Sequence, residues 1–223
     1  MSFKRVILTF GASALFVVLL GAVLFLVAGR YDLRWFWAYL GVFFVLSSCG
    51  WLFLDPDLIR ERLRPGKGAQ DAGTVQIGKA LSLAHFVIAS LDVGRFHWSD
   101  NVPAWLQGTA LVLFAAATGS ALWTMIINPF FASVVRIQKE RGHHLISDGP
   151  YRIVRHPGYT FVTVMMFTSG VALGSWWSCV PICLMWLLLI RRTVIEDRFL
   201  HKQLDGYPEY ARRVRYRLIP GIW

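Results

Sequence analysis

Two short stretches of this sequence carry side chains that can do chemistry, although most of the surrounding chain is apolar. The first stretch is GPYRIVRHPGY at 149–159, and the second is an adjacent pair of acids forty residues further on. Together they hold five candidate side chains: Arg155, His156, Tyr159, Glu196 and Asp197. An arginine can orient an anionic group through charge-assisted hydrogen bonds, and a carboxylate or a phenol can act in proton transfer. They form one site only if the fold brings the two stretches together.

The composition is that of a membrane protein. Hydrophobic residues make up 56% of the 223 residues, the mean hydropathy is +0.50, and charged residues make up only 16%. Soluble domains carry nearer a quarter of charged residues. The three cysteines, Cys49, Cys179 and Cys183, lie in apolar segments and match neither a disulfide framework nor a zinc signature. We expect them to be small buried hydrophobes.

Five apolar blocks are long enough to cross a bilayer. Three of them, 6–29, 35–54 and 104–127, are uncharged, and each can span a hydrocarbon core of about 30 Å. The first is longer than the apolar part of a signal peptide, so we expect it to remain as a transmembrane helix. The fourth block, 74–91, is weaker because it carries Lys79 and His85.

The fifth apolar block is too long for a single crossing. It runs over 158–190 and holds 33 uncharged residues, which correspond to roughly 50 Å of helix. The sequence GSWW at 174–177 supplies a Gly-Ser break and two tryptophans suited to a membrane interface. These features predict a hairpin of two short helices and six crossings in all.

The basic residues fall mainly on one side of these six crossings. Both termini then lie on the same side, together with the loops 55–73 and 128–157 and the tail 191–223. With Lys79, near the start of the block 74–91, this side holds 20 of the 23 lysines and arginines. Because basic residues gather on the cytoplasmic side of membrane proteins, we expect both termini to be cytoplasmic. Topology thus explains the net charge of +10, and no nucleic acid partner is expected.

The predicted hairpin brings the two chemical stretches together. His156 lies about 20 residues before the apex near Trp176, and Glu196 lies about 20 residues after it. Two antiparallel helices of equal length place both residues at the same depth. Pro157 suits a first helical turn and disfavours helix for the residue before it, so His156 is expected on irregular backbone just outside the helix. The alternative is that these residues anchor to lipid headgroups or form surface ion pairs.

The same residues match the pattern of a known family. HHLISDGPYRIVRHPGY, the two-helix apolar stretch, the ED pair and GYPEYARRVRYRLIPGI resemble, in this order, the isoprenylcysteine carboxyl methyltransferases and their prokaryotic relatives. The resemblance covers 128–223, and RERLRPGK at 60–67 is also similar to prokaryotic members. It implies an all-α integral membrane protein with about six transmembrane helices. Residues 1–127 would form a four-helix transmembrane region, and 128–223 a methyltransferase core whose loop, hairpin and tail enclose a cofactor.

What the resemblance implies is a methyltransferase that uses S-adenosyl-L-methionine. No strand–Gly-x-Gly-x-x-Gly–helix unit is present for a soluble Rossmann-type site. Carried over position by position, the family implies cofactor contacts at His143, Leu145, Gly149, Tyr151, His156, Tyr159 and Glu196. Methyl transfer requires alignment of donor and acceptor, and a base if the acceptor arrives protonated. The catalytic candidates are Arg155, Glu196 and Tyr159, with Asp197 as a further possible base, and no metal is expected.

The acceptor and the class of enzyme stay open at this point. A lipophilic or small membrane-permeable acceptor, carrying a carboxylate, thiol or amine, would enter sideways from the bilayer of a prokaryotic inner membrane. Asp197 stands where the family has a glutamate, and Arg136 stands where a eukaryotic member has glutamine. An NADPH-dependent membrane reductase of a sterol-like or unsaturated lipid would carry a similar Arg-His-Pro-x-Tyr element. A non-enzymatic membrane protein is a third alternative.

We also have expectations for several polar residues outside these stretches. His85 and Asp92 are ionisable groups at membrane depth, which suggests function. Asp92 is expected to pair with Arg95 near the outer surface, which leaves His85 as the functional candidate. Four residues of the tail are expected to close the cofactor pocket, the alternative being that they extend to headgroups: Tyr207, Tyr210, Arg213 and Arg217.

Overall fold

The computed structural model describes residues 3–68 and 70–223, and most of this part is helical. Residues 1, 2 and 69, and the side chains of Phe3, Lys4 and Arg5, lie outside the described part. The only β-pairing within it is an isolated bridge between Gln70 and Val135, so the predicted all-α fold class is confirmed. The helices are α1 Phe3–Ala28, α2 Arg34–Phe53, α3 Pro56–Leu63, α4 Ala72–Leu91, α5 Ala104–Ile127, α6 Pro157–Ala172, α7 Cys179–Gln203 and α8 Tyr207–Arg213.

Four helices are long and apolar enough to cross a membrane. These spans are Val6–Ala28, Arg34–Phe53, Ala72–Phe96 and Ala104–Ile127, the third of which combines α4 with a following π-helical turn, Asp92–Phe96. The four predicted N-terminal crossings are thereby confirmed, and the chain is an integral membrane protein. Helix α6 has 16 residues, about 24 Å, and α7 becomes charged from Arg191 onward. Six crossings therefore stay a prediction.

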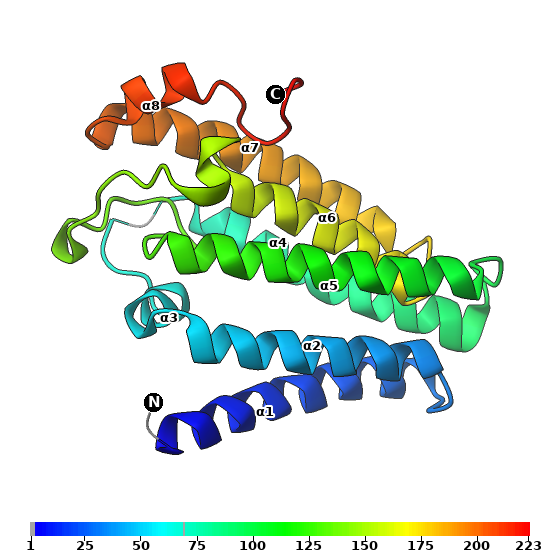
Figure 1. Cartoon of the computed structure of the whole chain (residues 1–223). Helices are drawn as coiled ribbons and strands as arrows, with labels where there is room; N and C mark the ends of the chain where they lie inside the picture. The colour runs from blue at the N-terminus through cyan, green and yellow to red at the C-terminus, as the bar shows by residue number, and fades with distance from the viewer. Residues whose placement is uncertain (1–2, 69) are drawn as a thin grey trace.

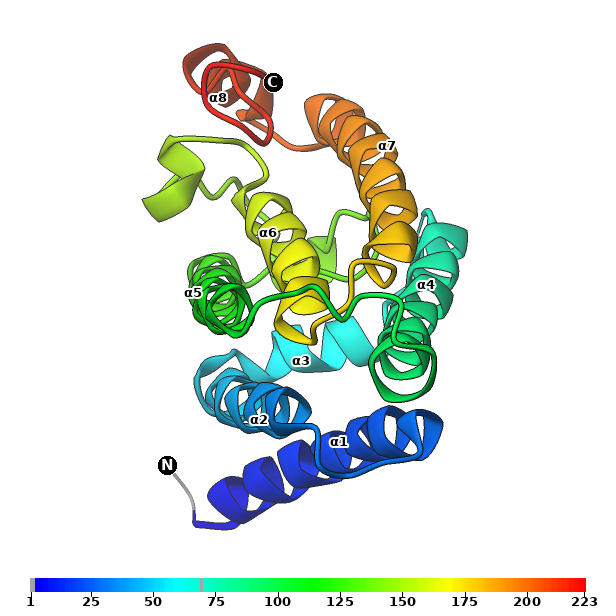
Figure 2. The ribbon, with the colours of Figure 1, turned by 90° about the vertical axis from the view of Figure 1, so that its right-hand side faces the viewer.

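The long helices lie side by side in a bundle (Figures 1 and 2). Helix α1 packs against α2 and α4, α5 against α2 and α6, and α7 against α4 and α6. The buried core between them contains Leu24, Phe36, Tyr39, Phe114 and Leu173. Because lipid is as apolar as these side chains, close packing and hydrogen bonds hold the helices together within a bilayer. The loop 128–156, α3 and α8 gather at one end of the bundle (Figure 1), which we call the site end.

The predicted hairpin is present, with its tip at the end of the bundle opposite the site end (Figure 1). Gly174 turns the chain with a φ of 85°, a left-handed value that favours glycine. Ser175 Oγ then donates to the carboxylate of Asp92, which also accepts from the backbone N–H of Ser99 at 2.9 Å and from the Ser99 hydroxyl at 2.6 Å. The hairpin tip is thus tied to the end of α4 by buried hydrogen bonds.

The structure changes two of our expectations about polar residues near the hairpin. The predicted pair of Asp92 with Arg95 is wrong, because Arg95 Nε donates to the carbonyl oxygen of Val27 at 2.6 Å while serines satisfy Asp92. His85 is buried, with Nδ1 2.9 Å from the carbonyl oxygen of Ser178 and Nε2 3.0 Å from the hydroxyl of Ser169. Both ring nitrogens of His85 are therefore satisfied by the hairpin, which gives this residue a structural role.

Candidate functional site

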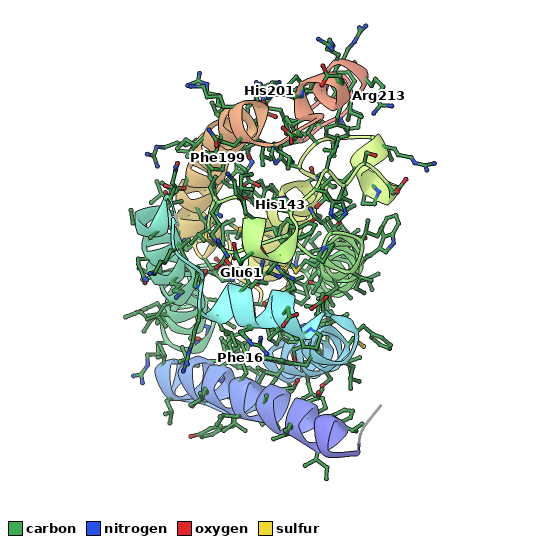
Figure 3. The ribbon with its side chains drawn as sticks, turned by 90° about the vertical axis from the view of Figure 1, so that its left-hand side faces the viewer. Phe16, Glu61, His143, Phe199, His201 and Arg213 are labelled. Carbon is green, nitrogen blue, oxygen red and sulfur yellow. The ribbon has the colours of Figure 1, made fainter. Side chains whose placement is uncertain are left out.

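A polar pocket with an empty volume of about 710 Å³ lies at the site end, between the loop 128–156, α6, α7 and α8. Six of the seven positions expected to contact a cofactor line it: His143, Leu145, Tyr151, His156, Tyr159 and Glu196. Figure 3 looks onto this end of the molecule and shows His143 near its centre, above Glu61 of α3.

The seventh position, Gly149, does not line the polar pocket. It begins a 3-10 turn, Gly149–Arg152, with a φ of 57°. A Cβ atom at this position would lie 2.5 Å from Cδ1 of Ile127 at the end of α5. Glycine is required because the loop backbone passes close to α5 in a left-handed conformation. The resemblance therefore identified an important position but not its physical role.

Gly149→Ala is expected to destabilise the protein by about 2 kcal/mol or more, since it combines a strained backbone with a steric clash. Gly142→Ala is the matched control: Gly142 also has a positive φ, 66°, but a Cβ atom at this position would meet no heavy atom within 4 Å. Thermal unfolding in detergent measures both. Equal losses in the two variants would contradict the role of the contact with Ile127.

Asp197 is the centre of a buried ion-pair network. Its carboxylate accepts hydrogen bonds from Arg155 Nε at 2.8 Å and Nη2 at 3.1 Å, Arg217 Nε at 2.9 Å, Tyr207 Oη at 2.9 Å and His156 Nε2 at 3.4 Å. Burial disfavours the ionised carboxyl, but the bonds from His156, Arg155 and Arg217 outweigh it and hold the pKa of Asp197 well below its usual range. A carboxylate bound in this way is not available as the general base that we considered from the sequence.

Arg155 links the start of the hairpin to the C-terminal tail. Besides Asp197, its guanidinium donates from Nη1 to the carbonyl oxygens of Val214 and Arg215, both at 2.8 Å. Its backbone N–H donates to the Tyr216 carbonyl at 2.9 Å. Although Arg155 lines the polar pocket, protein groups occupy four of its five side-chain N–H donors. This geometry is that of a positioning residue, rather than the acceptor-binding group that we expected.

Tyr159 and Glu196 line the polar pocket, and Tyr159 is bound by Arg192, which we considered from the sequence only as a surface ion-pair partner of Glu196. Tyr159 Oη donates to Glu196 Oε2 and accepts from Arg192 Nε at 2.8 Å, while Arg192 Nη2 donates to the Ser133 carbonyl at 2.7 Å. Glu196 Oε1 has no hydrogen-bond partner among the described residues. The i, i+4 spacing of Arg192 and Glu196 on one helix face was the signal that could have identified the arginine.

His143 is held on the opposite wall in its neutral form. Its ring stacks on Phe130 with a centroid separation of 4.5 Å, and Nδ1 accepts from the Gln138 backbone N–H at 3.3 Å. Burial, reinforced by the charges of His144 and Arg141, lowers the pKa of His143 to about 4. At neutral pH the imidazole ring of His143 is therefore uncharged.

Lowering the pH is expected to destabilise the protein through His143. Because the unfolded imidazole has a pKa near 6.5 and the folded one about 4, the unfolded state binds the proton first as the pH falls below 6.5. His143→Gln removes this term, so its melting temperature should fall less than that of the wild type between pH 7 and pH 5. His144→Gln, an exposed neighbour, is the control. Parallel melting curves for all three proteins would contradict this prediction.

The C-terminal tail closes one side of the polar pocket, as expected. Tyr207 and Tyr210 line it, and Tyr210 Oη donates to the Tyr151 carbonyl at 2.8 Å. Arg217 reaches Asp197 from the same tail. Arg213 differs from these three residues because it is exposed and lies on the outer side of α8, away from His143 (Figure 3).

The segment between α2 and α4, which includes α3, is bonded to the loop that lines the polar pocket. Arg136 donates to Glu61 of α3 through Nε at 2.7 Å and Nη2 at 2.9 Å, and it also pairs with Glu140. The side chains of Arg136 and Glu61 are both buried. The segment that resembles prokaryotic members, 60–67, is therefore anchored to the pocket loop by an ion pair.

A second, mainly apolar cavity adjoins the polar pocket. It lies between α4, α6 and α7, has an empty volume of about 970 Å³, and we call it the lateral cavity. Its apolar walls include Val75, Val162, Met166, Met185, Leu188 and Leu189. Three residues line both spaces: Phe131, Ala132 and Tyr159. Tyr159 therefore stands at the boundary between a polar pocket and an apolar space among membrane helices.

The chain is similar to one protein family and to several individual proteins. The phospholipid methyltransferase family matches residues 105–205. A probable protein-S-isoprenylcysteine O-methyltransferase of Oryza sativa is 38% identical over 87 residues, which are 38% of this chain and 45% of the relative. Protein-S-isoprenylcysteine O-methyltransferase B of Arabidopsis thaliana is 32% identical over 87 residues, which are 38% of this chain and 44% of the relative. The cobalt-zinc-cadmium resistance protein CzcN of Cupriavidus metallidurans is 27% identical over 143 residues, which are 62% of this chain and 61% of the relative.

Fold, site and relatives together define a class of protein: an integral-membrane helical bundle in which a loop, a helical hairpin and a tail enclose a polar pocket. The chain matches the phospholipid methyltransferase family over 105–205 and is similar to isoprenylcysteine O-methyltransferases, in agreement with the resemblance carried by the motifs in 128–223. It spans less than half the length of the isoprenylcysteine methyltransferases reported above.

Proposed function

We propose that the protein is a membrane enzyme that transfers a methyl group from S-adenosyl-L-methionine to an acceptor entering from the bilayer. One observation carries this proposal: the polar pocket and the lateral cavity share Tyr159 as a common wall. A water-soluble donor in the first space and a lipophilic acceptor in the second would meet there. A methyltransferase with such an acceptor has a physical reason to be embedded in a membrane.

The residues of the polar pocket fit the proposed cofactor. The carboxylate of Glu196, with one oxygen free of protein partners among the described residues, suits the ammonium group of its amino-acid portion. Leu145, Leu204 and Tyr210 provide apolar and aromatic surface for a planar base. When bound, the cofactor supplies a sulfonium methyl group, whose bond to sulfur breaks, leaving the electron pair on sulfur, as the bond to the acceptor forms.

The chain's own residues would act mainly by positioning. Alignment of donor and acceptor contributes about 7–11 kcal/mol in well-oriented reactions. Arg155 and Asp197 fix the tail over the pocket and so exclude water, whereas Arg192 orients the phenol of Tyr159. For an acceptor that arrives protonated, Glu196 is the group that can take the proton, directly or through Tyr159.

We also infer that the site end faces the cytoplasm of a prokaryotic cell. The distribution of lysines and arginines supports this orientation, and the residues at 60–67 support the prokaryotic origin. The relatives reported above lend no support to the reductase or the non-enzymatic alternative.

Calorimetry on the detergent-purified protein tests the proposed cofactor. S-adenosyl-L-methionine and S-adenosylhomocysteine are expected to bind in the micromolar range, and NADPH is expected not to bind. Transfer of a labelled methyl group from the cofactor into a total lipid extract would then identify the acceptor fraction. Binding of NADPH alone would replace the proposal by the reductase, and binding of none of the three would refute it.

A further inference from the structure

Residues 214–223 of the tail form a closed loop, which we call the tail hook. The carbonyl oxygen of Trp223 accepts hydrogen bonds from the backbone N–H groups of Arg217 at 2.8 Å and Ile219 at 3.1 Å. Gly221 turns the chain between them with a φ of 79°. The Arg217 guanidinium also lies 5.4 Å from the centre of the Trp223 ring. These internal contacts give the tail hook a defined shape.

The tail hook is bound to the first turns of α6. The backbone N–H of His156 donates to the Arg217 carbonyl at 2.9 Å, and Thr160 Oγ1 donates to the Leu218 carbonyl at 2.7 Å. Helix α6 packs along α5, whose membrane span Ala104–Ile127 ends at the site end. From α8 the chain turns back along α6 and α7 toward the hairpin tip (Figure 1). The tail hook therefore lies where the bilayer meets water.

The apolar side chains of the tail hook are exposed. Ile222 is 77% exposed, Ile219 44% and Tyr216 38%. The tail hook and α8 lie at the edge of the bundle, beside α6 and α7, rather than over its centre (Figure 2). An exposed apolar patch on a loop of defined shape marks an interaction surface. Because this loop lies at the edge of a membrane bundle and at the level of the bilayer surface, the partner that it meets there is lipid.

Two unpaired arginines accompany these apolar side chains. Arg213, at the end of α8, and Arg215, in the tail hook, are exposed and form no ion pair among the described residues. Arg212 differs because it pairs with Glu209 at 2.7 Å. Figure 3 shows Arg213 pointing outward from the edge of the bundle. Cations beside apolar side chains are suited to a bilayer surface with anionic headgroups. A neutral surface would accept the apolar side chains but leave both arginines without partners.

We propose that the tail hook and Arg213 dock on a bilayer surface that carries anionic headgroups, and that this docking holds the polar pocket closed. Arg217 of the tail hook donates to Asp197 at 2.9 Å, while Tyr207 and Tyr210 of α8 line the pocket. A tail held on the membrane keeps these residues in place and so favours the closed pocket. The docking is independent of any reaction, whereas its effect on cofactor binding rests on the proposed function.

Hydrogen exchange of the full chain, in nanodiscs that each hold a single copy, tests the docking. Two lipid compositions are compared: phosphatidylcholine alone, and an equal mixture of phosphatidylcholine and phosphatidylglycerol. The backbone amides of 212–223 are expected to exchange at least about tenfold more slowly in the anionic discs, because the two unpaired arginines are attracted to that surface. A high salt concentration should remove the difference, since it screens this attraction.

Arg213→Gln combined with Arg215→Gln should abolish the difference between the two lipid compositions. Ile222→Ser should speed exchange in both, because it removes a side chain that enters the lipid, and this variant decides if the arginine variant fails to fold. Lys139→Gln combined with Lys202→Gln is the matched control: both lysines are exposed, lie outside the tail hook and form no ion pair among the described residues. Equal exchange of the wild type in both compositions, or a difference that persists in the arginine variant, would overturn the inference.

The affinity for S-adenosylhomocysteine, measured in the same discs, tests the effect on the pocket. It is expected to be at least about threefold higher in the anionic discs, since docking raises the population of the closed pocket, and equal in both compositions for the arginine variant. An affinity of the wild type that does not depend on the lipid would overturn this effect. Slow exchange without S-adenosylhomocysteine binding would refute the proposed function and leave the docking standing. Exchange in detergent that slows as the protein concentration rises would identify a second copy as the partner and overturn the inference.

Discussion

Asp197→Ala is expected to destabilise the protein by about 3–5 kcal/mol, since it leaves the buried Arg155 without its counter-ion. It also removes the anchor of Arg217 and Tyr207, so the tail should detach from the pocket. Chemical unfolding in detergent measures the loss of stability, and limited digestion with trypsin measures release of the tail. Asp205→Ala is the control because Asp205 is exposed. Similar stability and similar digestion in the two variants would contradict the proposed network.

The same network predicts how acid affects the protein. The pKa of Asp197 is lowered by folding, so its contribution to stability is complete above the unfolded pKa of 3.8 and is lost as the pH falls toward the lower folded value. The difference in stability between wild type and Asp197→Asn should therefore be constant from pH 7 to pH 5 and narrow only below about pH 4. A difference that narrows already near pH 6 would show that another group controls the network.

Glu196→Gln is expected to weaken binding of S-adenosylhomocysteine by at least about tenfold, because it removes the charge that would hold the ligand's ammonium group. The glutamine side-chain oxygen can still accept from Tyr159, so stability should change little. Glu209→Gln, which removes an exposed carboxylate paired with Arg212 at 2.7 Å, is the matched control. Calorimetry compares the two variants. Wild-type affinity in Glu196→Gln would mean that this carboxylate does not hold the cofactor.

The hairpin and the meeting of its two ends were predictable from the sequence. An uncharged run too long for one crossing, interrupted by GSWW, required a turn near 174–177, and counting residues from this turn placed His156 opposite Glu196. The sequence did not show which of the two adjacent acids faces the polar pocket, because the packing of the helices determines this. Glu196 was a catalytic candidate and Asp197 a further possible base, but adjacent residues on a helix point in directions about 100° apart. One lines the polar pocket, and the other is buried in the ion-pair network.

The role of Arg155 could not be predicted from the pattern of residues in the sequence. Its guanidinium is occupied partly by the carbonyl oxygens of Val214 and Arg215. Every residue has such a carbonyl group, so nothing in the side chains of the tail specifies that these two are the acceptors. The contact of Arg192 with Tyr159 was not predictable for a related reason. Arg191 and Arg192 were equivalent partners for Glu196 in the sequence, and only the rotation of α7 makes one face Asp71 and the other Tyr159.

The polar tip of the hairpin has a consequence for biogenesis. Ser175 and Ser178 carry groups that are satisfied by Asp92 and His85 of the α4 segment, and unsatisfied polar groups are costly inside a bilayer. A hairpin that crosses the bilayer as predicted would therefore insert favourably only after α4 is already in the membrane with the correct orientation. Because the ends of this hairpin carry Tyr159 and Glu196, we expect the site to be assembled at the last stage of insertion. A substitution at the hairpin tip, at the end of the bundle opposite the site end, would thus be expected to prevent formation of the polar pocket.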